Sequence, residues 1–181
     1  MPWLARKPAI LLREITRPVK DHPVEQLPVV TDAPMPSPMP AWSYRFFNPA
    51  LKFLLRSPLH SAVSGMTMIL IFAGRKTGRR YDIVVVYHEE GGKLYTFSNT
   101  PWSKNFIGGA PVALRLRGAL VRATACVVDD LALIGRVIRC IERARGAQLV
   151  VGLGLIGAGP DGTPRLQMPK DSRLVEFTLA G

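Results

Sequence analysis

Two strand-like runs with a basic segment between them decide the fold of this chain. They are Met66-Thr67-Met68-Ile69-Leu70-Ile71-Phe72 and Tyr81-Asp82-Ile83-Val84-Val85-Val86-Tyr87. Both are rich in the β-branched and aromatic residues that favour strands. The segment between them, Gly74-Arg75-Lys76-Thr77-Gly78-Arg79-Arg80, contains two glycines and four basic side chains. We therefore expect a hairpin whose basic turn is held rigidly by two strands.

The composition of the basic loop, residues 74–80, is typical of an anion-binding loop. Glycine allows positive φ and leaves backbone N–H groups open, whereas arginine and lysine supply charged donors. Phosphate is the anion that such a loop fits best. The alternative is a solvated hairpin end that protects a sheet edge. The order of glycine and lysine does not match a Walker A loop, so nucleoside triphosphate hydrolysis is not indicated.

The overall composition predicts one globular domain with an appendage. The chain has 181 residues, of which 48% are hydrophobic and 20% charged, as in soluble proteins. A formal net charge of +11 indicates an acidic partner, which could be nucleic acid, an anionic membrane surface or a polyanionic small molecule. Cys126 and Cys140 lack CxxC spacing, which favours a reducing cytoplasm over a disulfide framework or a zinc site.

The N-terminal zone is set apart by its many prolines. We interpret residues 1–43 as an extended arm and residues 44–181 as the compact domain. The patch Ala9–Leu12 is too short for a secretory signal, and no apolar run reaches the about 20 residues of a membrane span. Because Trp3–Arg13 mixes apolar and basic residues, it is a candidate for peripheral contact with an anionic membrane at its inner face or for packing along a partner subunit. The alternative is a loosely attached tail.

The remaining elements follow from turn and capping signals. Asn48 as N-cap and Pro49 at the first helical position predict a short helix through Arg56. Glu89–Lys93 predicts a hairpin turn. The other expected elements are strands at 94–98, 112–116, 120–128 and 174–179, a short helix at 101–107 and a helix at 131–145. About six mostly antiparallel strands predict a mainly β fold with flanking helices, a small barrel with helices at its side.

One glycine pattern imitates a dinucleotide-binding site. Gly152–Gly157 matches G-x-G-x-x-G, but it is followed by Ala158-Gly159-Pro160-Asp161-Gly162, where no helix is expected to start. We expect instead a flexible apolar loop that packs on the barrel or forms one wall of a pocket.

No catalytic group of the chain's own stands out. His22, His60 and His88 lack metal-ligand spacing, and there is no G-x-S-x-G motif of a hydrolase. The sequence offers no nucleophile or acid–base pair. This favours an enzyme in which a bound cofactor carries the chemistry.

The order of motifs resembles the deazaflavin-dependent nitroreductase family, whose members are split β-barrels. The matching features are the loop at 74–80, a strand ending in Tyr87, a strand ending in Ser98, Trp102-x-x-Asn105 and Gly-x-Pro-Val at 109–112. The resemblance covers roughly Asn48 to Val128 and leaves out the arm. The combination of the loop with Trp-x-x-Asn is more specific than either motif alone.

The resemblance implies binding of coenzyme F420, a deazaflavin with an anionic tail of phosphate and carboxylates. By likeness, the tail would be held by the glycine-bounded loop with Gly74, Arg75, Lys76, Thr77, Gly78, Arg79 and Arg80. The ring and polyol chain would lie along Tyr87, Ser98, Trp102 and Asn105. Hydride would pass from C5 of the reduced ring to a small acceptor of quinone, enone or nitroaromatic type, and a proton would come from solvent or a nearby hydroxyl such as that of Ser98.

Three departures from the family pattern bear on the substrate. The stretch between Ser98 and Trp102 is short, and Val84 stands where many relatives have proline. The tyrosines that nitroreductase members contribute from their C-terminal part are missing, because the last tyrosine is Tyr95. Nitroimidazole reduction is therefore not assumed.

Alternative functions stay open at this point. The same barrel could hold FMN, whose single phosphate needs fewer cations than the loop offers. It could also bind a deazaflavin or a lipid without turnover, or bind an anionic surface. Nucleic acid is not expected, because there is no recognised motif or array of exposed aromatics. A homodimer is a further candidate assembly.

Overall fold

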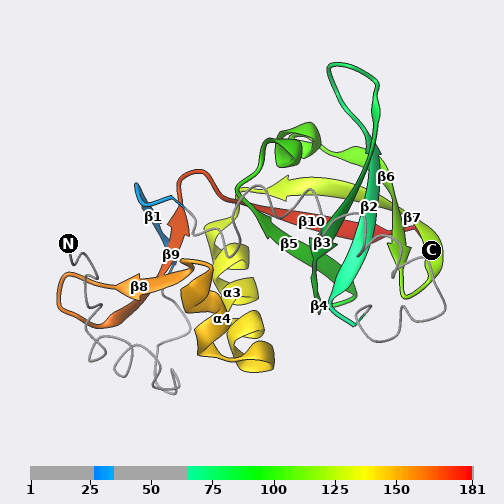
Figure 1. Ribbon diagram of the computed structural model, residues 1–181. Helices are drawn as coiled ribbons and strands as arrows, with labels where there is room; N and C mark the ends of the chain where they lie inside the picture. Colours follow the sequence, from blue (N-terminus) through cyan, green and yellow to red (C-terminus); the bar gives the residue numbers. More distant parts are fainter. Residues whose placement is uncertain (1–26, 35–64, 181) are drawn as a thin grey trace, which may run out of the picture.

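The computed structural model describes residues 27–34 and 65–180 of the chain. The predicted helix Asn48–Arg56 and most of the proline-rich arm lie outside these residues. The described part forms a seven-stranded sheet, a three-stranded sheet and helices between them (Figure 1). No helix in this part is long and apolar enough to cross a membrane.

The seven-stranded sheet is antiparallel throughout. In spatial order its strands are β3 (Arg80–Val86), β2 (Thr67–Ala73), β6 (Ala110–Leu116), β7 (Ala119–Val128), β10 (Arg173–Leu179), β5 (Lys93–Ser98) and β4 (His88–Glu90). The predicted strands at 66–72, 81–87, 94–98, 112–116, 120–128 and 174–179 are confirmed within one or two residues.

The sheet curls into a barrel because one stretch of chain serves both of its edges. Only Tyr87 separates β3 from β4, and these two strands lie at opposite ends of the strand order. Across this join the Tyr87 N–H donates to the Met66 carbonyl at 2.9 Å, and the Thr96 hydroxyl donates to the Val86 carbonyl at 2.8 Å. The architecture is mainly β with a few helices, consistent with a split β-barrel, as the sequence predicted.

Alternating apolar residues fill the barrel. On β2, Met68, Leu70 and Phe72 point inward, because side chains of a strand alternate between its two faces. They pack with buried residues of the other strands of the seven-stranded sheet except β4, including Val85, Leu94, Leu114, Ala125 and Phe177. This interior fixes where β2 and β3 end, and therefore where the basic loop begins.

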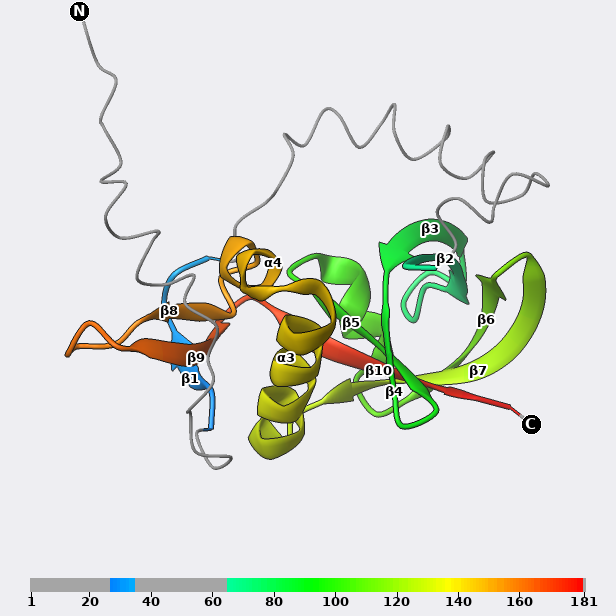
Figure 2. The same cartoon turned by 90° about the horizontal axis from the view of Figure 1, so that it is seen from below.

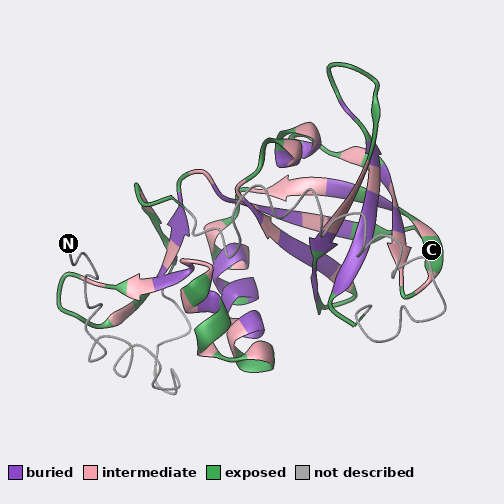
Figure 3. Cartoon of the chain, viewed as in Figure 1, coloured by how far each residue is buried: buried purple, intermediate pink, exposed green. Residues whose placement is uncertain are grey.

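A second hydrophobic cluster lies outside the barrel. It joins α3 (Leu131–Arg145), α4 (Ala147–Gly152) and the three-stranded sheet of β1 (Val29–Thr31), β9 (Pro164–Pro169) and β8 (Ile156–Ala158) to the outer side of β5 and β10. The two helices lie between the barrel and the small sheet (Figure 2), and α3 turns its buried face inward (Figure 3). Asp130 caps α3, as expected, by accepting from the Ala132 and Leu133 N–H groups at 2.8 and 3.3 Å.

One local prediction is wrong, the short helix expected at 101–107 is confirmed, and one strand was not predicted. The stretch Gly152–Gly157 is not a flexible loop: it contains the end of α4 and the start of β8, and Gly157 leaves room for the Gln167 side chain. The helix after β5 is a 3₁₀ helix, η2 (Pro101–Phe106). Within the arm, β1 pairs in parallel with β9, which the prolines had not suggested. The pairing of β1 with β9 joins segments that are far apart in sequence, which local patterns do not show.

Candidate functional site

The basic loop is a tight hairpin turn whose glycines are both required. The Thr77 and Gly78 N–H groups donate to the Gly74 carbonyl at 3.2 and 2.7 Å, and the Gly74 N–H donates to the Arg79 carbonyl at 2.8 Å. Gly78 has φ of +64°, a conformation that favours glycine. A Cβ on Gly74 would lie 2.9 Å from Cε2 of Tyr81. The turn is therefore closed by backbone hydrogen bonds between its two ends.

The 3₁₀ helix η2 is anchored at both of its ends. At its start the Ser98 hydroxyl bonds with the Thr100 hydroxyl at 2.7 Å and accepts from the Thr100 N–H at 3.1 Å. At its end Phe106 is fully buried and contacts Phe72 and Phe177 edge-on, with ring centroids 5.2 and 6.4 Å apart. These contacts fix η2 beside the basic loop at one end of the barrel.

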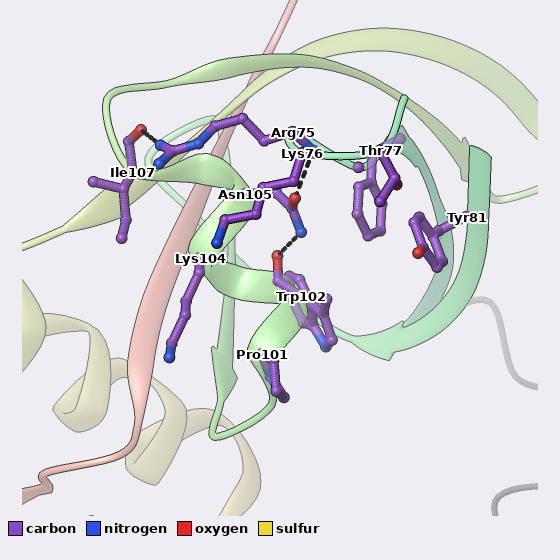
Figure 4. Close-up of a pocket in the computed structure, with 11 residues that line it drawn as sticks. Arg75, Lys76, Thr77, Tyr81, Pro101, Trp102, Lys104, Asn105 and Ile107 are labelled. Carbon is purple, nitrogen blue, oxygen red and sulfur yellow. Dashed lines mark hydrogen bonds between the residues drawn. The ribbon is translucent and has the colours of Figure 1, made fainter. Parts of the chain in front are cut away.

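Asn105 connects the loop to η2. Its Oδ1 accepts from the Arg75 N–H at 2.8 Å, and its Nδ2 donates to the Trp102 carbonyl at 2.8 Å (Figure 4). A second link is formed by Nη1 of Arg75, which donates to the Ile107 carbonyl at 3.3 Å. The two segments thus form one unit although 30 positions separate Arg75 from Asn105.

Between the loop and η2 lies an open cavity of about 580 Å³. Its lining combines aromatic and basic side chains. The lining residues are Phe72, Gly74, Arg75, Lys76, Thr77, Tyr81, Pro101, Trp102, Lys104, Asn105 and Ile107. Tyr81 is stacked on Phe72 with centroids 5.4 Å apart, and Trp102 lies tilted against Phe72 at 6.5 Å.

The cavity is electropositive. In the described part of the chain, no carboxylate forms a salt bridge with its cations Arg75, Lys76 and Lys104. Outside the cavity, Arg80 pairs with Asp82 at 3.0 Å and the Arg79 guanidinium lies 5.8 Å from the centre of the Tyr81 ring. Unpaired cations on low-dielectric walls raise the local concentration of anions.

The structure brings together six of the predicted site residues at this cavity. They are Gly74, Arg75, Lys76, Thr77, Trp102 and Asn105. Gly78, Arg79 and Arg80 belong to the same loop but do not line the cavity.

Tyr87 and Ser98 lie elsewhere. Tyr87 is 2% exposed, packs in the barrel interior and forms a side-chain hydrogen bond with Arg117. It follows the end of β3 that is farther from the basic loop. The Ser98 hydroxyl is engaged with Thr100. Neither residue lines the cavity.

Five lining residues were missed by sequence reasoning: Phe72, Tyr81, Pro101, Lys104 and Ile107. Two of them had a usable signal. Phe72 and Tyr81 flank the loop and are paired across β2 and β3, which hairpin symmetry implies. Lys104 precedes Asn105 directly, but nothing in the sequence shows that η2 faces the loop.

The expected role of the loop backbone needs correction. The N–H groups of Arg75, Thr77, Gly78 and Arg79 all donate within the protein, the last to the Thr77 hydroxyl at 3.3 Å. The glycines had suggested that these N–H groups are open to an anion, but they are engaged within the protein. Recognition of an anion by the loop would therefore depend mainly on side chains.

Other reactive groups lie away from the cavity. Cys126 and Cys140 are free thiols. Among residues 27–34 and 65–180, no three His, Cys, Asp or Glu side chains are grouped so that they could hold a metal ion.

The chain matches no family model and no curated protein. Among solved structures it is similar to a putative pyridoxamine 5'-phosphate oxidase from Listeria innocua, with 12% identity, a TM-score of 0.43 and coverage of 67% of this chain and 91% of that one. The heme storage protein HutZ from Vibrio cholerae is 15% identical with a TM-score of 0.44, and the match covers 74% of this chain and 89% of that one. The FAD and heme binding protein from Mycobacterium smegmatis is 12% identical with a TM-score of 0.41, and the match covers 69% of this chain and 67% of that one. These similarities are too distant to assign a function, which has to be inferred from the cavity.

Proposed function

We propose that this protein binds coenzyme F420 in the cavity and transfers hydride from the reduced deazaflavin to a small organic acceptor of quinone, enone or nitroaromatic type. The observation that carries the proposal is the cavity of about 580 Å³ in which Arg75, Lys76 and Lys104 meet the aromatic wall. A flat aromatic ring joined to an anionic tail is the kind of ligand that such a lining suits.

The lining residues fit the chemical parts of the cofactor. Trp102, Tyr81 and Phe72 form an apolar wall against which a ring system can pack. The three cavity cations can hold a phosphate, and Arg79 and Arg80 extend the positive charge along the loop for further carboxylates. Arg80 is exposed on the outside of the loop, where a long tail would emerge.

The protein's own part is to bind, orient and exclude water. Reduced F420 supplies the hydride, and the chain adds no nucleophile of its own. Because Ser98 is engaged with Thr100, the hydroxyl groups of Thr77 and Tyr81 are better placed than Ser98 to pass a solvent proton to an acceptor in the cavity.

FMN is the second candidate ligand, and one observation favours it. Arg80 is already paired with Asp82, and Arg79 lies against Tyr81, so three cations remain in the cavity itself. Three cations are enough for a single phosphate. A longer polyanionic tail would have to recruit the exposed arginines.

Titration separates these ligands. F420 and FMN are added separately to the purified protein while their fluorescence is followed, and we expect F420 to bind more tightly. Reduced F420 is then mixed with a quinone, a cyclic enone and a nitroaromatic compound, and its reoxidation is followed. Tight FMN binding without F420 binding would favour the second candidate. F420 binding without turnover of any acceptor would indicate a carrier, and binding of neither ligand would overturn the proposal.

A further inference from the structure

The cavity is made of two halves that come from different parts of the chain. The β2–β3 loop contributes Gly74 to Thr77, and the η2 segment contributes Pro101 to Ile107. Each half brings at least one cation, and the described residues place no carboxylate in the lining. Like charges on the two halves repel each other, so the cavity needs neutral contacts that hold the halves together.

Asn105 supplies such a contact with one end of its amide, while the other end fixes the side chain within η2. An amide can accept through its oxygen and donate through its nitrogen at the same time. Here the oxygen binds the Arg75 N–H and the nitrogen binds the Trp102 carbonyl, each at 2.8 Å. Of these two bonds, only the one from Arg75 crosses between the halves; among the described residues a second crossing bond runs from Nη1 of Arg75 to the Ile107 carbonyl and is longer, at 3.3 Å.

We infer that Asn105 is a positioning residue: it assembles the cavity by tying the basic loop to η2, and leaves contact with the ligand to the cations and to Trp102. The family resemblance would place Asn105 along the ligand itself. In this chain each polar atom of its side chain already has a protein partner. The identity of the ligand rests on the proposed function, but the tie between Arg75 and Asn105 does not.

The geometry also explains the choice of residue. A carboxylate at position 105 could accept from the Arg75 N–H but could not donate to the Trp102 carbonyl, and it would pair with the cavity cations. Leucine has a similar size and would make neither bond. Asn105→Asp therefore removes only the bond to Trp102, whereas Asn105→Leu removes both bonds.

The test compares Asn105→Leu and Asn105→Asp with the parent protein. Hydrogen exchange of the Arg75 amide is measured by NMR in the ligand-free protein, and F420 affinity is measured by fluorescence. In Asn105→Leu we expect Arg75 exchange to become about tenfold faster or more and F420 affinity to fall about tenfold or more, as for the loss of two hydrogen bonds. In Asn105→Asp the Arg75 amide should keep its protection while affinity falls.

Two controls distinguish positioning from other roles. Lys104→Gln removes a cavity cation, so it should lower F420 affinity without changing Arg75 exchange. The amides of Leu70 and Phe72 in β2 report whether a variant has merely loosened the barrel, and they should exchange as in the parent. If Asn105→Leu unfolds, Asn105→Ala takes its place, because it also removes the acceptor of the Arg75 amide.

The inference is overturned if Asn105→Leu lowers affinity while Arg75 keeps the exchange rate of the parent, because Asn105 then contacts the ligand directly. It is also overturned if Arg75 exchange rises and affinity does not change. If the parent binds neither F420 nor FMN, the proposed function fails, whereas the exchange data on the ligand-free protein still decide whether Asn105 ties the loop to η2.

Discussion

The barrel has two basic hairpin turns that look alike in sequence and differ in structure. At the β2–β3 turn, Arg75 and Lys76 line a cavity and form no salt bridge with a described carboxylate. At the β6–β7 turn, Arg117 pairs with Glu89 at 2.5 Å, and Arg115 donates to the Gly118 carbonyl at 3.1 Å. The two basic turns therefore differ in whether the fold brings a carboxylate to their cations.

The two turns also differ in how the chain is shaped around them. The β2–β3 turn is shaped by glycine and by the tie to η2. At the β6–β7 turn, Arg117 itself has φ of 49°, and its guanidinium reaches Tyr87 and Glu89, where β3 passes into β4. The charge of Arg117 at this second turn is therefore used within the fold, at the segment that joins β3 to β4.

The largest effect on F420 affinity should come from removing the two cations that the first turn contributes to the cavity. We expect Arg75→Ala combined with Lys76→Ala to lower F420 affinity on the order of a hundredfold or more, because hydrogen bonds to charged groups contribute about 1.5–3 kcal/mol each. The loss should shrink at high salt, which screens charges. Arg136→Ala, an exposed arginine on α3, is the matched control. Equal F420 affinity of the double variant and the control would contradict the proposal that the cavity binds F420.

Trp102 should affect binding and stability together. It is partly buried and lies 5.8 Å from Phe106 between ring centroids, so Trp102→Ala should cost less than the ~3–5 kcal/mol of a fully buried aromatic residue. Loss of a stacking surface worth about 1–3 kcal/mol should also weaken F420 about tenfold. Urea unfolding and F420 titration measure the two effects. A loss of stability with unchanged affinity of the folded protein would make Trp102 a core residue only.

His88, beside the second turn, should affect stability through pH. It is buried, and burial, followed by the nearby Arg145, lowers its pKa from the usual 6.5, against the smaller opposing effects of Glu90 and Glu89. The folded state thus favours neutral imidazole, so this contribution is present above pH 6.5 and is lost as the pH falls through the range below it. The free energy of unfolding, measured from about pH 7 to about pH 5, should fall less steeply in His88→Gln. Equal slopes would contradict the prediction, and F420 affinity should not change.

The smallest effect should come from breaking the ion pair at the second turn. Arg117 and Glu89 have side chains 58% and 47% exposed, and such pairs contribute about 0.2–1 kcal/mol. We expect a double-mutant cycle with Arg117→Ala and Glu89→Ala to give a coupling in that range and F420 affinity within about twofold of the parent. A large loss of F420 affinity in Arg117→Ala would mean that the two turns are not functionally distinct.

Local sequence determined most elements of this protein. Runs of β-branched and aromatic residues predicted β2 and β3, alternating apolar residues predicted β6, the pair of glycines predicted the basic turn, and Asp130 marked the start of α3. These signals are short-range, because they reflect side-chain periodicity and backbone preferences within a few residues. They were sufficient for the fold class and for six of the residues at the cavity.

Tertiary structure decided what those elements do. Sequence alone could not show that Tyr87 points into the barrel, that Ser98 is engaged with Thr100, or that β1 pairs with β9. Nor could it show that Lys104 faces the basic loop while Glu89 neutralises Arg117. These outcomes depend on which distant strands meet, since the net effect of a charge depends on its neighbours in space. The sequence by itself therefore determined where the cations are, and only the tertiary structure decided which of them are left for a ligand.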